Sequence, residues 1–256
     1  MERRFILREN GLQIPCVLEE PEFCTVRRCI IGVHGFCGSK DSKILEDIAE
    51  EMGLFGAATV RFDFPAHGDS AVTDWGLTLQ RCQDTLTAVV RWAKKAFPYV
   101  DMGLFATGFG AFVTLVTLDD LRIIHEKLKL VLQTPDLHMA QSLLHMAHVT
   151  EEELRRLGRV IVGPTMKRPV EVSYSFYQEL QEHMVYYNHE MPMLLLHGEL
   201  DDVVPLQYLD PFRRFNDQSK LVTIPGAGHG LAYAIEPDRY VEELYDFFGP
   251  ECSYQK

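Results

Sequence analysis

Two segments in the second half of the chain carry side chains that can move protons. Segment 197–205 (HGELDDVVP) contains Asp201, and segment 224–230 (IPGAGHG) contains His229. Each follows a short apolar run of the kind that forms a buried strand. A carboxylate that orients an imidazole, which then takes up and returns a proton, is suited to general base catalysis. Asp202 is the poorer candidate for the acid, since the motif places its acid four residues before its proline.

A third segment, 103–111 (GLFATGFGA), has the pattern of a sharp turn from a strand into a helix. Where such a turn presents a nucleophile, a small residue lies two positions before it and another two positions after it. Ala106 and Gly110 are these small residues, so Gly108 occupies the nucleophile position. Glycine suits the strained positive-φ backbone of the turn, but it supplies no attacking oxygen. Thr107 would take this position only in a frame flanked by two phenylalanines, which are too large.

Two further segments follow predicted strands and are expected to support the same site. Segment 34–36 (HGF) comes directly after the apolar run 29–33. In an acyl hydrolase the turn after this strand supplies one backbone N–H to the oxyanion hole, and here that donor is the N–H of Phe36. Segment 61–70 (RFDFPAHGDS) contains a glycine turn, which we expect to brace the site rather than to react.

The elements that must position these segments alternate between strand and helix. Asn10-Gly11, between the runs 4–8 and 12–18, predicts a β-hairpin. Apolar runs without alternation predict parallel strands that are covered on both faces, and the segments between them have helical spacing. The expected strands are 29–33, 58–62, 102–106, 128–132, 193–196 and 221–224, and the expected helices are 44–52, 79–96, 109–124, 206–215 and 239–248. The sequence therefore predicts an α/β fold with a mostly parallel, doubly wound sheet.

The region from about 135 to 190 interrupts this alternation. It is rich in His, Met, Tyr and Glu, it contains helical pieces such as 150–157, and it lacks a clear central strand. We expect a cap or lid inserted above the sheet. No linker rich in Gly, Ser or Pro divides the chain, so we expect one domain over residues 1–256.

Composition excludes several classes of partner. The formal net charge of -12 argues against nucleic acid and against anionic membrane surfaces, because the basic groups that neutralise phosphate are too few. The six cysteines show no CxxC pair, and there is neither a secretory leader pattern nor an apolar run of about 18 residues. These features predict a cytoplasmic protein with reduced thiols, without membrane attachment and without a cofactor.

Two weaker features are interpreted as structural. His138, His145 and His148 would share one face of a helix, but no carboxylate or cysteine completes a metal site, and the methionines nearby indicate an amphipathic cap helix. Cys37 follows the expected oxyanion donor and could serve as a substitute nucleophile. We do not expect this role, because attack must come from the side of the turn at 108.

The chain resembles the α/β-hydrolase superfamily along essentially its whole length, and most of all the bacterial cinnamoyl/feruloyl esterases and related serine carboxylesterases. The matching stretches are HGFCGSK (34–40), RFDFPAHGDS (61–70), ATGFGA (106–111), HGELDDVVP (197–205) and IPGAGHG (224–230). The resemblance implies the α/β-hydrolase fold, with a cap over a hydrophobic acyl site. It also implies that Asp201 and His229 are acid and base, and that the N–H groups of Phe36 and Phe109 form the oxyanion hole. The family has serine where Gly108 stands.

Three functions are compatible with these residues. The first is an esterase scaffold for small-molecule esters or related acyl ligands, impaired by a glycine that is either natural or engineered. The second is a ligand-binding or sensory protein without turnover, although such a protein would not need the Asp201–His229 pair. The third is direct hydrolysis, in which His229 activates a water molecule and no acyl-enzyme forms. The sequence does not specify an oligomeric state.

Overall fold

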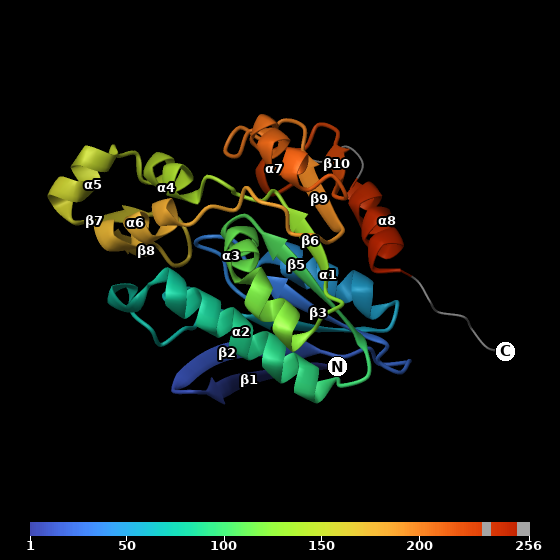
Figure 1. Ribbon diagram of the computed structural model, residues 1–256. Coiled ribbons are helices and arrows are strands. Elements are labelled where there is room, and N and C mark those ends of the chain that lie inside the picture. The colour runs from blue at the N-terminus through green and yellow to red at the C-terminus, as the bar shows by residue number, and fades with distance from the viewer. Residues whose placement is uncertain (232–236, 250–256) are drawn as a thin grey trace.

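A mixed β-sheet forms the centre of the computed structural model, which describes residues 1–231 and 237–249 (Figure 1). Its strands are, in chain order, β1 (Glu2–Glu9), β2 (Leu12–Glu19), β3 (Arg28–Val33), β4 (Ala57–Phe62), β5 (Asp101–Thr107), β6 (Lys129–Gln133), β9 (Met193–Gly198) and β10 (Lys220–Ile224). They lie in the order β1-β2-β4-β3-β5-β6-β9-β10. The pairs β1–β2 and β2–β4 are antiparallel, and all other neighbouring pairs are parallel. The predicted mostly parallel sheet is confirmed.

The hairpin at the start of the chain turns where the sequence predicted. Asn10 and Gly11 have φ angles of 50° and 80°, as a two-residue turn with two left-handed positions requires. The turn pairs β1 with β2, and β2 pairs with β4 on its other side, so β1 lies at the edge of the sheet.

Successive residues of a strand point to opposite faces of the sheet, and in the central strands almost all residues of both sets are buried. Helices therefore cover both faces. The main helices are α1 (Lys43–Gly53), α2 (Leu79–Ala96), α3 (Phe109–Ile124), α7 (Leu209–Phe215) and α8 (Pro237–Phe248). Phe105 packs in the apolar cluster that includes α1 and α8, whereas its neighbours Leu104 and Ala106 pack in the cluster that includes α2 and α3. The fold is therefore doubly wound, as predicted. Short 3₁₀ turns occur at Asp74–Gly76, Leu206–Tyr208 and His229–Leu231.

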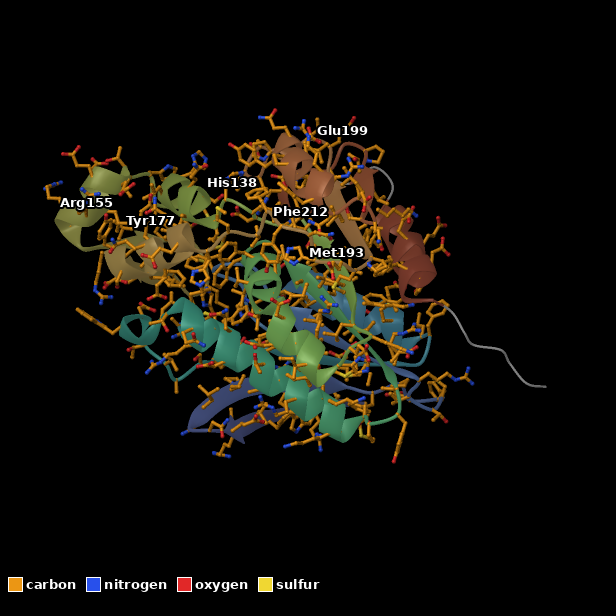
Figure 2. The ribbon with its side chains drawn as sticks, viewed as in Figure 1. His138, Arg155, Tyr177, Met193, Glu199 and Phe212 are labelled. Atoms are coloured by element: carbon orange, nitrogen blue, oxygen red, sulfur yellow. The ribbon has the colours of Figure 1, made fainter. Side chains whose placement is uncertain are left out.

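The region between β6 and β9 adds elements that do not join the large sheet. These are α4 (Met139–Ala147), α5 (Glu151–Leu157), β7 (Arg159–Val162), β8 (Val170–Ser173) and α6 (Tyr174–Glu182). Strands β7 and β8 pair antiparallel in a sheet of their own. The sequence analysis did not predict this hairpin, because two four-residue strands are too short to establish a period. Figure 2 shows Arg155 and Tyr177 in this region, far across the view from Met193 at the start of β9.

Side chains of this region bind the segment between β4 and α2. The Arg168 guanidinium donates hydrogen bonds to the carbonyl oxygens of Gly68 at 2.6 Å and Ser70 at 3.1 Å, and also to those of His67 and Val72. Glu179 on α6 accepts a hydrogen bond from the Leu79 N–H at the start of α2 at 2.6 Å. The region is thus fastened to the body of the fold at two separate points.

Two sequence expectations concern features that the structure covers only in part. No helix within residues 1–231 and 237–249 is long and apolar enough to cross a bilayer. The cysteines at 16, 24, 29, 37 and 82 are free thiols, whereas Cys252 lies outside the described residues.

Candidate active site

Gly108 forms the sharp turn between β5 and α3. Its φ of 48° and ψ of −114° lie in a region that residues with a side chain rarely adopt, which confirms the positive φ expected from the sequence. Apart from its two chain neighbours, the only heavy atom of the described residues within 4 Å of a Cβ added at Gly108 is the Gly35 Cα, at 3.9 Å. Backbone strain, rather than lack of space, is therefore the obstacle to a side chain at this position.

Gly110 shows why the turn needs a small residue two positions further on. A Cβ there would lie 2.5 Å from the His34 carbonyl oxygen and 2.7 Å from that of Val33. Helix α3 thus begins in contact with the end of β3, which brings the turn after β3 beside Gly108.

Asp201 and His229 come together from the loops after β9 and β10. Nδ1 of His229 lies 3.1 Å from Oδ2 and 3.2 Å from Oδ1 of Asp201. A carboxylate can only accept, so the neutral imidazole carries its proton on Nδ1, and Nε2 keeps a free lone pair. Nε2 accepts no hydrogen bond from any residue that the structure describes. The prediction that this histidine is hydrogen-bonded to this aspartate is confirmed.

The Asp201 carboxylate is buried and held by its own loop. Burial alone would raise its pKa, but the hydrogen bonds from His229 and from the Val204 N–H at 2.8 Å outweigh burial, so that the pKa lies below its usual range. The Val203 N–H donates a further bond at 3.0 Å. Asp201 is therefore ionised at neutral pH, and it can orient an imidazole and stabilise its cation.

Gly108 and His229 line one pocket of about 150 Å³, and Phe36 and Phe109 belong to the same lining. The N–H groups of Phe36 and Phe109 donate no hydrogen bond to any other described residue, so both are available to an anionic oxygen. Their rings meet edge to face, with centroids 5.2 Å apart. The structure thus brings together at one pocket the turn, the imidazole and the two expected donors.

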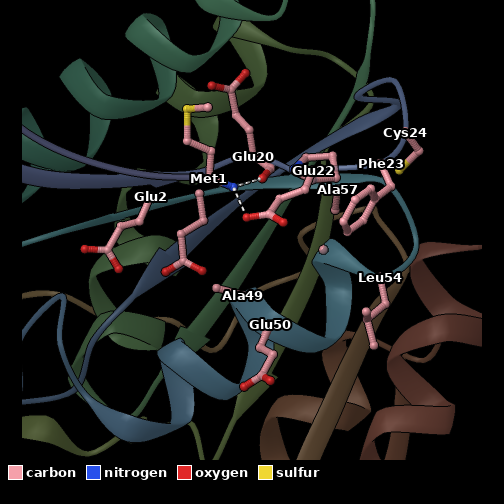
Figure 3. Close-up of a pocket in the computed structure, with 13 residues that line it drawn as sticks. Met1, Glu2, Glu20, Glu22, Phe23, Cys24, Ala49, Glu50, Leu54 and Ala57 are labelled. Carbon is pink, nitrogen blue, oxygen red and sulfur yellow. Dashed lines mark hydrogen bonds and ion pairs between the residues drawn. The ribbon is translucent and has the colours of Figure 1, made fainter.

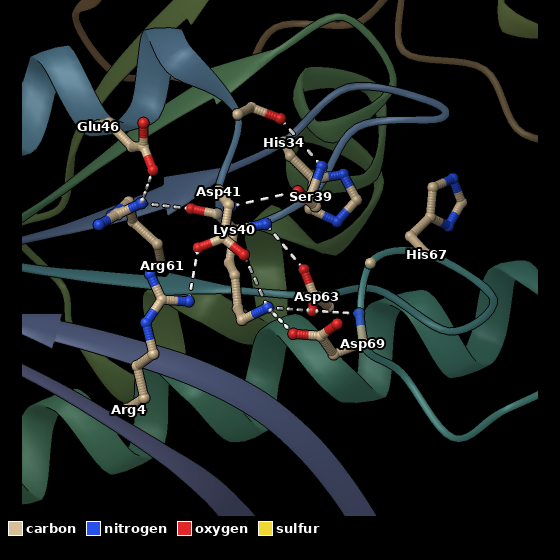
Figure 4. A network of polar contacts seen from close by, with 12 residues as sticks. Arg4, His34, Ser39, Lys40, Asp41, Glu46, Arg61, Asp63, His67 and Asp69 are labelled. Atoms are coloured by element: carbon tan, nitrogen blue, oxygen red, sulfur yellow. Dashed lines mark hydrogen bonds and ion pairs between the residues drawn. The ribbon is translucent and has the colours of Figure 1, made fainter. Parts of the chain in front are cut away.

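A buried network joins the turns that follow β3 and β4 (Figure 4). Nδ1 of His34 donates to the Gly35 carbonyl oxygen at 2.7 Å, and Nε2 accepts from the Phe64 N–H at 3.0 Å. Burial lowers the pKa of His34 to about 4, so the ring is neutral. Asp63 accepts from both the N–H and the Nζ of Lys40, at 2.7 and 3.0 Å. Asp63 therefore braces the turn that carries the Phe36 donor, which is the supporting role expected for segment 61–70.

Asp136 is a pocket residue that the sequence analysis did not single out. It follows β6, lines the same pocket as Gly108, and donates its backbone N–H to the Gly108 carbonyl oxygen at 3.3 Å. The signal was present, because Asp136 follows a predicted strand just as Asp201 does, and ligands bind at these strand ends in open α/β sheets.

The weaker candidates have other partners. Nε2 of His138 bonds to the hydroxyl group of Tyr186 at 2.6 Å, and no cluster of three possible metal ligands occurs in the part of the chain that the structure describes. The Cys37 thiol contacts the Val162 carbonyl oxygen, and burial raises its pKa to about 11. A thiol that rarely ionises is a poor nucleophile.

A larger pocket of about 530 Å³ lies beside Ala57, the first residue of β4, and so at the opposite end of that strand from the turn that follows it (Figure 3). Among the described residues the two pockets share no lining residue. The larger pocket is bordered by carboxylates and exposed apolar groups, among them Glu2, Glu20, Glu22, Phe23 and Leu54. It holds none of the candidate catalytic side chains.

The strand order, the strained turn after β5 and the loops after β9 and β10 together define the α/β-hydrolase fold, and the chain has this fold. Residues 162–253 match the model of the prolyl oligopeptidase family. No curated protein matches the sequence.

Solved structures share the fold over nearly the whole chain. The structure of Est1E from Butyrivibrio proteoclasticus with bound ferulic acid has a TM-score of 0.80 at 22% identity, covering 95% of this chain and 97% of its own. Mouse alpha/beta hydrolase domain-containing protein 10 has 0.75 at 16%, covering 96% and 98%. The esterase domain of a Rhodothermus marinus protein has 0.70 at 18%, covering 95% and 96%. The fold expected from the sequence resemblance is confirmed.

Proposed function

We propose that this protein is a carboxylic-ester hydrolase by architecture, in which Asp201 and His229 are the acid and base and Gly108 occupies the position of the nucleophile. The observation that carries the proposal is the His229–Asp201 hydrogen bond at 3.1 Å. The histidine lines the same pocket as Gly108, whose backbone is strained and where a side chain would have room. Without an oxygen at 108 the chain forms no acyl-enzyme, so its ester hydrolysis is impaired.

Each residue has a defined part in the reaction that this architecture serves. A serine oxygen at 108 would attack the ester carbonyl and give its proton to Nε2 of His229, while Asp201 stabilises the imidazolium. The N–H groups of Phe36 and Phe109 would hold the oxyanion. His229 would then protonate the leaving alcohol, and water would release the acid from the acyl-enzyme by the same steps.

The ligand class follows from the pocket lining and from a structural neighbour. Besides the polar groups, the pocket is lined by apolar side chains, including Ile44, Met139 and Met146. Such a lining suits the acyl group of a small ester. The similar Est1E structure holds ferulic acid, which supports an acyl ligand for this chain as well.

The region from about 135 to 190 is proposed to be the cap of this acyl site, within a single domain. Its helix α4 contributes Met139 and Met146 to the pocket that contains Gly108. The Arg168 contacts with the segment after β4 hold the cap in place. Substrate choice would then depend on the cap rather than on the sheet.

The test is to supply the missing oxygen. Gly108→Ser should raise the rate of hydrolysis of p-nitrophenyl acetate or of a feruloyl ester by a factor on the order of 10³ or more. Serine hydrolases lose activity by at least this factor when the triad nucleophile is removed. Gly108→Ala is the matched control, since it adds the same Cβ without the oxygen, and it should gain nothing. A folded Gly108→Ser protein without gain on any ester would favour the alternative, a ligand-binding or sensory protein.

A further inference from the structure

Asp136 places a carboxyl group in the lining of the pocket, whereas Asp201 lies behind His229 and is not part of that lining. Its Oδ1 accepts hydrogen bonds from the Ser142 hydroxyl at 2.9 Å and from the His138 N–H at 3.2 Å. These bonds fix the carboxyl group, whereas Oδ2 accepts none from a described residue and is not among the fully buried unpartnered atoms. Because Asp136 lines the pocket, Oδ2 is the oxygen of this carboxyl group that remains to accept a hydrogen bond from a bound molecule.

The Asp136 carboxyl group is electrostatically coupled to both the proposed base and the proposed acid: the Asp201 charge raises its pKa, and a positive charge on His229 lowers it. Burial raises the pKa of Asp136, and the bonds from Ser142 and His138 offset this only in part. A carboxylate of raised pKa is more basic and accepts hydrogen bonds more strongly. The bond from the Asp136 N–H to the Gly108 carbonyl oxygen also ties its backbone to the turn.

We propose that Asp136 is a catalytic residue for direct ester hydrolysis by this chain, in which Oδ2 of Asp136 and Nε2 of His229 together hold the attacking water above Gly108. The proposal rests on the proposed function, since it uses the same acyl site. A water molecule that donates both protons to two fixed acceptors directs its lone pairs elsewhere, here toward a carbonyl carbon whose oxygen faces the N–H groups of Phe36 and Phe109. The absence of a side chain at 108 leaves room for this water.

The reaction balances without a covalent intermediate. The water oxygen forms a bond to the carbonyl carbon, the carbonyl electron pair moves onto its oxygen, and one water proton passes to Nε2 of His229. Asp136 accepts a hydrogen bond from the remaining proton of the water. The intermediate then collapses, the bond from carbon to the alcohol oxygen breaks, and His229 returns its proton to that oxygen. The products are a carboxylic acid and an alcohol.

The test compares nitrophenolate release from p-nitrophenyl acetate by the wild-type chain and by four variants. The wild type should exceed His229→Ala and should show no initial burst. Asp136→Asn keeps an oxygen for Ser142 but turns an N–H toward the water, and it should slow turnover by a factor on the order of 10 to 100. Asp136→Glu, which keeps the carboxylate, should retain more activity than Asp136→Asn. Asp120→Asn, at an exposed position on α3, is the matched control and should be unchanged.

The Gly108→Ser background separates this proposal from the proposed function. There the serine oxygen replaces the water in acylation, so adding Asp136→Asn should slow the acylation burst by a smaller factor than it slows turnover of the chain with Gly108. If folded Asp136→Asn turns over at the wild-type rate, Asp136 does not have the proposed role. If Gly108→Ser gains activity in the same experiment, the proposed function still stands. If folded Gly108→Ser gains no activity, the proposed function is contradicted. Thermal melting of each variant establishes that it is folded.

Discussion

His229 and Asp201 form a hydrogen-bonded pair, with Nδ1 of the imidazole 3.1 Å from Oδ2 of the buried carboxylate, beside a residue that has no side chain to activate. The pair spans two loops, and two backbone N–H groups also hold the carboxylate. Burying a carboxylate has a free-energy cost that only such contacts offset. The arrangement is the one that the proposed proton transfer through His229 requires.

The first prediction concerns backbone strain at residue 108. Gly108→Ala should lower the free energy of unfolding by about 1–3 kcal/mol, because its φ and ψ are unfavourable for any residue with a Cβ. Gly53→Ala is the matched comparison, since Gly53 ends helix α1 outside the positive-φ region and its added Cβ would lie within 4 Å of no described residue beyond its own helix and chain neighbours. That variant should gain about 0.4–1 kcal/mol. Urea unfolding measures both, and equal stability of Gly108→Ala and wild type would argue against a strained turn.

The second prediction is that the two buried carboxyl groups of the site, Asp201 and Asp136, affect stability in opposite directions with pH. Folding lowers the pKa of Asp201, so its stabilising contribution is present above the unfolded pKa and is lost as pH falls through the lower folded value. Folding raises the pKa of Asp136, so stability is lost as pH rises from the unfolded toward the folded value. Asp201→Asn should thus cost about 1–3 kcal/mol at pH 7 and less in acid. Asp136→Asn should not destabilise at pH 7.

Urea unfolding at pH 7 and at about pH 4, near the ordinary pKa of an aspartate, measures both effects. Asp202→Asn is the control, because Asp202 is exposed beside Asp201. Parallel pH dependences for the Asp201 and Asp136 variants would contradict the assigned directions.

The third prediction concerns the attachment of the proposed cap. Arg168→Ala removes the donors to four carbonyl oxygens between residues 67 and 72, and it should make the region 135–190 more sensitive to limited proteolysis. Lys167→Ala, at an exposed neighbouring position, should leave the cleavage rate unchanged. Arg168→Lys should restore protection only in part, since an ammonium lacks the guanidinium fork. Unchanged cleavage of Arg168→Ala would show that this arginine does not fasten the region.

The sequence predicted the parts of the structure that depend on local patterns. Helices α2 and α3 begin and end at the predicted residues, because amphipathic spacing and the turn at Gly108 are encoded in adjacent positions. The order along the chain, with the turn at Gly108 first, then Asp201 and then His229, likewise predicted that these three residues would lie together. The contacts of Arg168 could not be predicted, since its carbonyl partners lie about 100 residues earlier in the chain. Asp136 was overlooked because one aspartate after a strand, without a motif around it, has little specificity.

The central claim, that residue 108 faces the imidazole as a nucleophile position, is tested most directly by covalent labelling. Gly108→Ser should react with a fluorophosphonate probe, and peptide mapping by mass spectrometry should place the label at position 108. The wild type should not be labelled there, and adding His229→Ala to Gly108→Ser should abolish labelling, because the serine oxygen then lacks its base. A folded Gly108→Ser protein that stays unlabelled, or whose labelling persists without His229, would contradict the claim.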